Sequence, residues 1–271
     1  MPLLLSLLHA VAFSAPTDCK AVGLTDLAAV PAPAILVLGE TPGEPDDLRR
    51  AYKLVRALRG RDRVTVGLQA IHQDYQGALQ GMVADAPDLG ALDETVQWST
   101  HWPWSSAGYR GVLTMGLTDV AGGVQLTALG GDEIPPRGAE VGSVPEGYAE
   151  RLQSISDGTL TGSMAARVAR ARSWSDSRMA ERALEAWGGE GYLVVIVDRT
   201  RVAGPGGVDW QLERRASQSV HAVVLDWSDA DCMDGEKQWV TPRWTLAMPA
   251  FMTRLEGVFG GGQTSSSSAR P

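Results

Sequence analysis

Basic residues and long apolar runs are both scarce in this chain, and each shortage excludes a class of protein. The 271 residues include 24 Lys and Arg against 32 Asp and Glu, which gives a formal net charge of -8. Because no local cluster of Lys or Arg offsets this charge, the sequence predicts no nucleic-acid binding. The apolar run at residues 1–15 is too short to span a bilayer, and we expect no transmembrane segment elsewhere.

Cysteine and histidine are also few, with two and four residues. The chain lacks the Gly-x-Ser-x-Gly motif of serine hydrolases, the His-Glu-x-x-His motif of zinc hydrolases and a closely spaced pair of zinc-binding cysteines. Gly39 and Gly43 lack the spacing and the Lys of a phosphate-binding loop, and Asp46 and Asp47 would repel phosphate. The common motifs for covalent, zinc and phosphate chemistry are therefore absent.

The two ends of the chain differ in composition from its middle. Residues 1–15 join an apolar run to small residues and resemble a secretory signal peptide, although they include no basic residue. We therefore expect an exported protein, periplasmic or extracellular, in which residues 16–33 form an N-terminal arm. Residues 258–271, rich in Gly and Ser, predict a disordered tail, which leaves residues 34–257 as a single α/β domain.

Export would place Cys19 and Cys232 in an oxidising compartment. A disulfide between the N-terminal arm and the acidic loop at 229–234 is chemically sensible there, and two unrelated free thiols are the alternative. Cys19 follows Pro16, Thr17 and Asp18, which are not the small residues that precede a lipid-attached cysteine. We do not expect a lipid anchor.

Short apolar runs alternate with helical periodicity through the middle of the chain. Strands are expected at residues 34–38, 63–68, 124–129, 192–197 and 220–225, with an edge strand at 238–246. Helices are expected after Pro45, over most of residues 73–119, over residues 146–187 with a break near 157–158, and over residues 211–216. This alternation predicts an α/β fold with a mostly parallel central sheet and helices on both faces. Parallel strands end at one edge, where such folds bind ligands, and Glu40 stands at the end of the first strand.

Several short motifs also stand in a familiar order. They are Leu38-Gly39-Glu40 with Pro45, Val66-Gly67-Leu68-Gln69, Trp102-Pro103-Trp104 with Tyr109-Arg110, Ser175-Asp176-Ser177-Arg178-Met179-Ala180, and Val194 to Val202 with Gly207-Val208. Together they resemble the haem-binding uptake proteins of the ChaN type, within the superfamily that includes Tiki and TraB proteins and erythromycin-esterase-like hydrolases. The resemblance covers residues 35–227 and implies a three-layer α/β/α domain, here called ChaN-like.

This chain departs from the family pattern where chemistry is expected. The resemblance implies a His two residues after Glu40, a Glu at position 69 and a His at position 201, but Pro42, Gln69 and Arg201 stand there. Proline has no side-chain ligand, Gln is a weak one, and the Arg guanidinium repels a cation. We therefore expect no catalytic metal and a protein that has lost its reaction.

The candidate ligand cleft lies at the carboxyl ends of the strands and comprises Glu40, Gln69, Asp132 and Arg201. Glu40 is either a surviving site carboxylate, paired with Arg201, or a charge that favours the helix after Pro45. Asp176 and Met179 precede a strand on a helical segment, which favours a helix-positioning role over catalysis.

Three residues near this edge could ligate or contact haem iron, namely His72, Tyr75 and Tyr109. Each also has an ordinary structural interpretation: His72 as a helix-start residue, Tyr75 on a helix surface, and Tyr109 packed on Trp102 or Trp104. The Trp-rich turn of Trp98, Trp102 and Trp104 favours core packing, with a flat porphyrin pocket as the alternative.

Two candidate functions remain, one of a binding protein and one of an enzyme. The first is a binding module that takes haem or a similar flat ligand, or has decayed to a surface for a protein partner. The second is a metal-dependent or metal-independent hydrolase in which Glu40 works with substitutes such as His101, Asp132 or His221. Convergence of Glu40, Gln69 and Arg201 with no His within reach would disfavour the hydrolase.

Overall fold

A sheet of five parallel strands, in the order β3-β2-β4-β1-β5, forms the centre of the part of the chain that the structure describes. The computed structural model describes residues 23–84, 90–118, 123–131, 133–156, 159–202 and 205–225. Within these ranges no helix is both long and apolar enough to cross a membrane.

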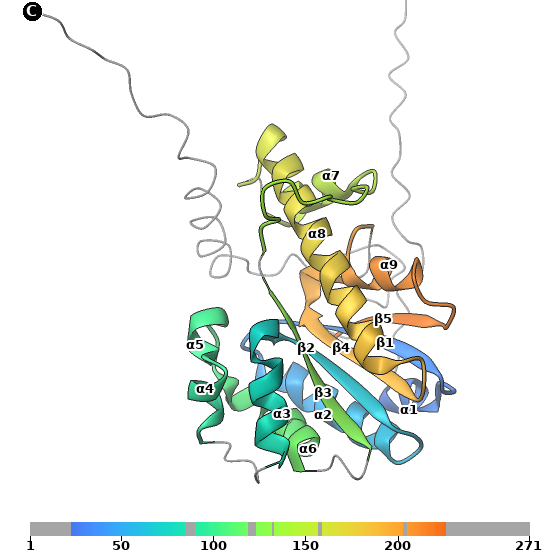
Figure 1. The fold of residues 1–271 in the computed structure, drawn as a ribbon. Helices are drawn as coiled ribbons and strands as arrows, with labels where there is room; N and C mark the ends of the chain where they lie inside the picture. Colours follow the sequence, from blue (N-terminus) through green and yellow to red (C-terminus); the bar gives the residue numbers. More distant parts are fainter. Residues whose placement is uncertain are drawn as a thin grey trace, which may run out of the picture.

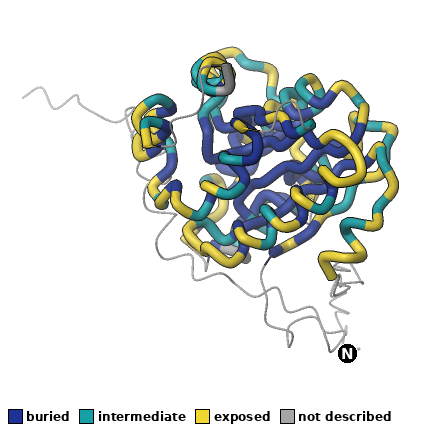
Figure 2. Tube along the Cα trace, turned by 90° about the horizontal axis from the view of Figure 1, so that it is seen from below, coloured by how far each residue is buried: buried dark blue, intermediate teal, exposed yellow. Residues whose placement is uncertain are grey.

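The strands are the apolar runs of the sequence. Their bounds are β1 Ala34–Glu40, β2 Val64–His72, β3 Val124–Gly130, β4 Tyr192–Asp198 and β5 Val220–Val224. All residues of β1 and β4 are buried, and Figure 2 shows the central strands in dark blue inside a more exposed shell. A strand that is covered on both faces has a continuous apolar sequence, so burial explains the apolar sequences of β1 and β4.

Helices connect and cover the strands. They are α1 Leu24–Ala29, α2 Pro45–Arg59, η1 Gln73–Tyr75, α3 Gln76–Ala84, α4 Leu92–Thr95, α5 Trp98–His101, η2 Ser106–Tyr109, α6 Arg110–Thr118, α7 Tyr148–Ile155, α8 Gly162–Trp187, η3 Arg199–Arg201 and α9 Val208–Glu213. Helix α2 begins where the sequence favours it, since Glu44 caps the Asp46 amide and Pro45 occupies the first turn. Helix α8 ends at Trp187 and is capped by Gly188, which adopts a left-handed conformation (φ +67°).

The helices form two layers because the chain crosses the sheet in both directions. The connections from β1 to β2 and from β2 to β3 bring α2 and α6 onto one face, and those from β3 to β4 and from β4 to β5 bring α8 and α9 onto the other (Figure 1). Right-handed crossovers that run in opposite directions cover opposite faces. The three-layer α/β/α fold expected from the sequence is confirmed.

A satellite core lies beyond the carboxyl edge of the sheet. Helix α7 and the first half of α8 pack through Tyr148, Leu152 and Val168, apart from the two cores that flank the strands. In Figure 1 this pair of helices extends past the strand ends, above the sheet. Residues from α7 and α8 are thereby placed beside the edge where a site was expected.

Most expected elements are found, with two differences. Strand β2 continues past Leu68 to His72, and the last helix covers Val208–Glu213 instead of 211–216. The helical pattern at 146–187 forms two helices, as expected. The predicted signal peptide, the edge strand at 238–246, the tail, Cys19, Cys232 and Asp132 all lie outside the described residues.

Candidate functional site

The carboxyl ends of three neighbouring strands bring Glu40, Gln69 and Asp198 together. Glu40 and Asp198 are paired across β1 and β4, and the Gln69 side chain accepts a 2.8 Å hydrogen bond from the Asp198 amide. The loops that leave β1 and β4 run to opposite helical layers, the arrangement in which doubly wound sheets bind ligands. Two of the expected site residues, Glu40 and Gln69, are thus held around Asp198.

Glu40 is buried and only partly hydrogen-bonded. Tyr109 donates a hydrogen bond to its Oε1, while Oε2 has no hydrogen-bond partner among the described residues. Burial raises the pKa of Glu40 to about 8, the Tyr109 hydrogen bond acts in the opposite direction, and the charges of Asp198 and Asp47 add to the increase. Glu40 is therefore a neutral acid at pH 7, and it is not an exposed charge at the start of α2.

Tyr109 serves as the hydrogen-bond partner of Glu40. Its side chain is 1% exposed and packs edge-on against Trp98, with 5.0 Å between the ring centroids. Burial, followed by the charge of Glu40, raises its pKa well above the ordinary value. A phenolate ligand for iron is therefore disfavoured at this residue. Of the two expected partners, Trp102 lies within hydrogen-bonding reach of Tyr109, and Trp102 and Trp104 also pack on each other with 5.1 Å between ring centroids.

The expected core packing of the Trp-rich turn is confirmed for Trp98 and Trp102, which are 3% and 6% exposed. Trp98 donates a 2.8 Å hydrogen bond to the carbonyl of Trp104, which fixes the turn. Trp104 covers Gly43, the glycine of the turn after β1, so closely that an added Cβ there would lie 2.5 Å from the indole ring. Trp104 therefore packs directly on the turn that follows β1.

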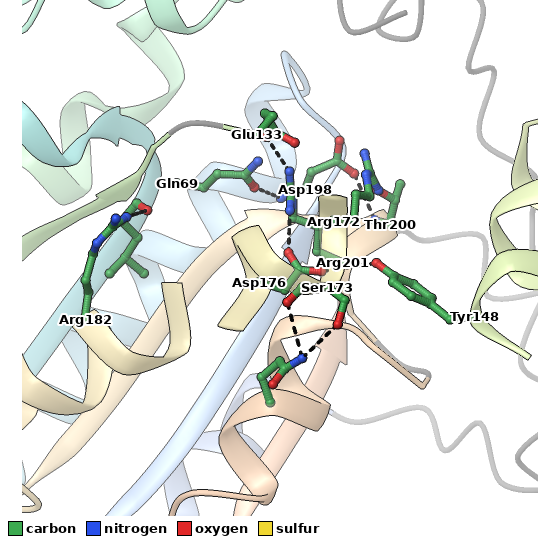
Figure 3. A network of polar contacts seen from close by, with 12 residues as sticks. Gln69, Glu133, Tyr148, Arg172, Ser173, Asp176, Arg182, Asp198, Thr200 and Arg201 are labelled. Atoms are coloured by element: carbon green, nitrogen blue, oxygen red, sulfur yellow. Dashed lines mark hydrogen bonds and ion pairs between the residues drawn. The ribbon is translucent and has the colours of Figure 1, made fainter. Parts of the chain in front are cut away.

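The alternative in which Glu40 pairs with Arg201 is wrong. Arg201 pairs instead with Asp176 from α8 and with Glu133 from the loop after β3 (Figure 3). The physical reason is the side of the sheet: Glu40 faces the α2 and α6 layer with Tyr109, whereas Arg201 faces α8. Arg201 and Glu40 thus lie at the same edge of the sheet, but their side chains point toward opposite helical layers.

Arg201 is the centre of a buried polar network. Burial alone would lower its pKa, but the charges of Glu133 and Asp176 raise the pKa above its ordinary value, so Arg201 stays charged. Asp176 also accepts a 3.2 Å hydrogen bond from the Tyr148 hydroxyl. In Figure 3, Tyr148 approaches this network from the side opposite Glu133. The network thus joins the satellite core to the end of β4.

Helix α8 makes a second contact with the segment that follows β4. Arg172, one turn before Asp176, donates a 2.7 Å hydrogen bond to the Thr200 hydroxyl. The expectation of a helix-positioning role for Asp176 agrees with these contacts, and Met179 lies in the core between α8 and the sheet. The sequence signal for this network was the pair of charged residues Arg172 and Asp176 on the buried face of a helix.

A second cluster stands at the end of β2. His72 stacks on His101 with 4.6 Å between ring centroids and an interplanar angle of 27°, and Tyr75 lies 5.5 Å from His101 and 6.4 Å from His72. The register between β2 and β3 shifts between Leu68 and His72, an irregularity of the kind that redirects side chains at strand ends. All three residues were candidates from the sequence, but only His72 and Tyr75 were expected near the same ligand, and His101 was not expected beside them.

The other candidates do not join either group. His221 is paired with Leu36, well before the end of β1, and contacts the Ser219 hydroxyl at 3.2 Å. Pro42 lies in the turn after β1 and has no polar side chain to offer. Within the described ranges, no three His, Cys, Asp or Glu residues are arranged to hold a metal ion.

Comparison with known proteins supports the fold and the resemblance. Residues 27–130 match the family model described as "Haem-binding uptake, Tiki superfamily, ChaN". The solved structure described as "Cofacial heme binding to ChaN of Campylobacter jejuni" matches with a TM-score of 0.51 at 13% identity, over 70% of this chain and 79% of that one. No curated protein matches the sequence. At such low identity the structural likeness concerns the fold alone, and the family match covers residues 27–130, less than half of the chain.

Proposed function

We propose that this protein binds haem, or a flat ligand like it, at the cluster of His72, Tyr75 and His101. The observation that carries the proposal is the meeting of two imidazoles and one phenol at the carboxyl end of β2. All three residues lie within the segment that matches the haem-binding family model. The matched structure from Campylobacter jejuni is described as haem bound to ChaN, which supports the same ligand.

The donor set fits iron held in a porphyrin. Imidazole and phenolate are both axial ligands of haem iron, and the porphyrin itself supplies the four equatorial nitrogens. A haem therefore requires only one or two protein ligands, which His72, His101 and Tyr75 can provide. A bare zinc ion usually takes three or four protein ligands, a larger number than this cluster offers.

Binding without catalysis is the function that the strand ends support. Gln69 is engaged with the Asp198 amide, and Arg201 is engaged with Asp176 and Glu133. Neither side chain titrates near neutral pH, so neither can replace the His and Glu of the hydrolytic relatives. These fixed contacts support a binding role in place of a hydrolytic one.

The direct test is a titration of the purified protein with hemin, followed by the Soret band. We expect a shifted Soret maximum in the wild type, a weakened shift in His72→Ala and in His101→Ala, and an altered spectrum in Tyr75→Phe. His221→Ala is the matched control, because His221 lies on β5, away from the cluster. A wild-type Soret band identical to that of free hemin would refute the proposal.

One observation favours the alternative function, a hydrolase that uses Glu40. A buried carboxyl with a pKa of about 8 is suited to general acid or base catalysis near neutral pH. If Glu40 is catalytic, Glu40→Gln will abolish hydrolysis of a panel of ester, lactone and peptide substrates. If the protein is a haem-binding module, wild type and Glu40→Gln will both lack hydrolysis and will bind hemin alike.

We further propose that the protein is exported and that Cys19 and Cys232 form a disulfide after export. The support is the apolar run and small residues at 1–15 and the presence of only two cysteines. Mass spectrometry of the mature protein, with and without reduction before alkylation, tests both statements. An intact N-terminus after expression in a secreting host would contradict export, and two alkylated thiols without reduction would contradict the disulfide.

A further inference from the structure

The glycine that follows β3 is surrounded by polar side chains. A Cβ added at Gly131 would lie 2.9 Å from Nη1 and 3.5 Å from Nη2 of Arg182, and 3.4 Å from Nε2 of Gln73. All three of these nitrogens are hydrogen-bond donors. Because Gly131 has no side chain, a small cradle remains there, lined by a guanidinium and an amide.

This cradle lies beside the proposed haem-binding cluster. His72 is paired with Gly130 across β2 and β3, so Gly131 directly follows the strand partner of His72. Gln73 follows His72 in the chain, and the short helix η1 carries Gln73 at its start and Tyr75 at its end. Neighbouring strands are only about 4.8 Å apart. The cradle and the cluster therefore occupy the same part of the sheet edge.

The fold holds Arg182 in this place. Arg182 belongs to the long helix α8, and its Nη1 donates a 3.1 Å hydrogen bond to the Leu129 carbonyl. In Figure 3, Arg182 lies apart from the network around Arg201. Arg182, Gln73 and Gly131 are all half-buried. A ligand can therefore reach them, while the surrounding chain restricts their positions.

The donors of the cradle suit a carboxylate. A planar guanidinium carries five N–H donors and binds carboxylates through two parallel hydrogen bonds, to which a side-chain amide can add a third. The chain has a net charge of -8, so an anionic ligand requires a cation close to its binding site. Haem is such a ligand, because two propionate groups extend from one edge of the porphyrin ring.

We propose that Arg182 and Gln73 bind a propionate of the haem whose iron is held by His72 or His101. The inference rests on the proposed haem function for the identity of the ligand, but the carboxylate site itself rests on the geometry around Gly131. In this arrangement Arg182 determines specificity, because it distinguishes a porphyrin acid from a neutral porphyrin of the same shape.

The test compares hemin with hemin dimethyl ester, in which the propionates carry no charge. Both are added from the same cosolvent, and binding is followed by the Soret band. We expect the wild type to bind hemin about 10-fold more tightly than the ester, because hydrogen bonds to a charged group are the stronger ones. Arg182→Gln should bind hemin and the ester equally well. A purely structural role of Arg182 would instead weaken both ligands by the same factor.

Three further variants separate the charge of Arg182 from the space beside it. Arg178→Gln removes a positive charge from the same helix at an exposed residue that pairs with Glu181, and it should leave the preference for hemin unchanged. Gly131→Ala keeps Arg182 but fills the cradle, so it should reduce the preference. Gly142→Ala is its control, because an added Cβ there meets no atom within 4 Å.

Iron-free protoporphyrin distinguishes this inference from the haem function. It carries both propionates but no metal, and its fluorescence reports binding. An unchanged preference for hemin in Arg182→Gln would overturn the inference even if the wild type binds hemin. Binding of protoporphyrin that depends on Arg182, together with a Soret band identical to that of free hemin, would confirm the carboxylate site and refute iron ligation. A wild type that binds neither porphyrin would overturn both proposals.

Discussion

Arg201 and Asp176 form an ion pair in which both side chains are almost completely buried, at 1% and 0% exposed. The pair links the end of β4 to the middle of α8. Glu133, whose side chain is 24% exposed, binds the other Nη atom of Arg201 and extends the pair toward the surface. Arg201 thus holds a permanent charge with two fixed partners.

Removing one member of this pair should destabilise the protein strongly. Arg201→Met leaves Asp176 buried without its cation, and breaking a buried pair in this way typically costs about 3–5 kcal/mol of unfolding free energy. Urea denaturation monitored by circular dichroism measures the loss. Arg63→Gln is the control, because its pair with Glu190 is exposed and should contribute no more than about 1 kcal/mol.

The double variant Arg201→Met with Asp176→Leu removes both charges at once. We expect it to be more stable than Arg201→Met alone, because Asp176, the more deeply buried of the two carboxylates that Arg201 binds, no longer stays in the interior without Arg201. A double variant at least as unstable as the sum of the two single variants would contradict a direct coupling between these residues.

Glu40 should make stability depend on pH between about 5 and 8. Its pKa rises from 4.5 to about 8 on folding, so the folded protein retains a proton that the unfolded chain releases. The favourable contribution is complete below pH 4.5 and is lost as the pH rises toward 8, with a slope that approaches about 1.4 kcal/mol per pH unit. Urea midpoints at pH 5, 6.5 and 8 should fall more steeply in wild type than in Glu40→Gln. Parallel pH dependences in the two proteins would show that Glu40 is ionised in the fold.

The turn after β1 should tolerate no side chain at Gly43. This glycine has φ +87°, and an added Cβ would lie 2.5 Å from the ring of Trp104. Gly138 is a matched control with φ +81° and no atom within 4 Å of its added Cβ. Gly138→Ala should cost about 1 kcal/mol from backbone strain alone, and Gly43→Ala should cost about 1–3 kcal/mol more from overpacking. Equal losses by thermal or urea denaturation would mean that Trp104 moves away freely.

The local sequence was sufficient for the strands and helices of this protein and for their parallel arrangement. The apolar runs that became β1 and β4 are continuous because both faces of each strand are buried, and the helix after Pro45 begins with Pro and two acids in its first turn. Glu40 and Gln69 could be placed at one sheet edge for the same reason, since parallel strands end together.

What the sequence could not determine is which side chains meet across that edge. Arg201 pairs with Asp176 instead of Glu40 because the segment after β4 turns toward α8, whereas Glu40 faces the opposite helical layer. His101 reaches His72 because α5 packs at the end of β2. Strands and helices follow from neighbours in sequence, but the partner of a charged or aromatic side chain depends on strand order and on the layer it faces, which only the tertiary structure decided.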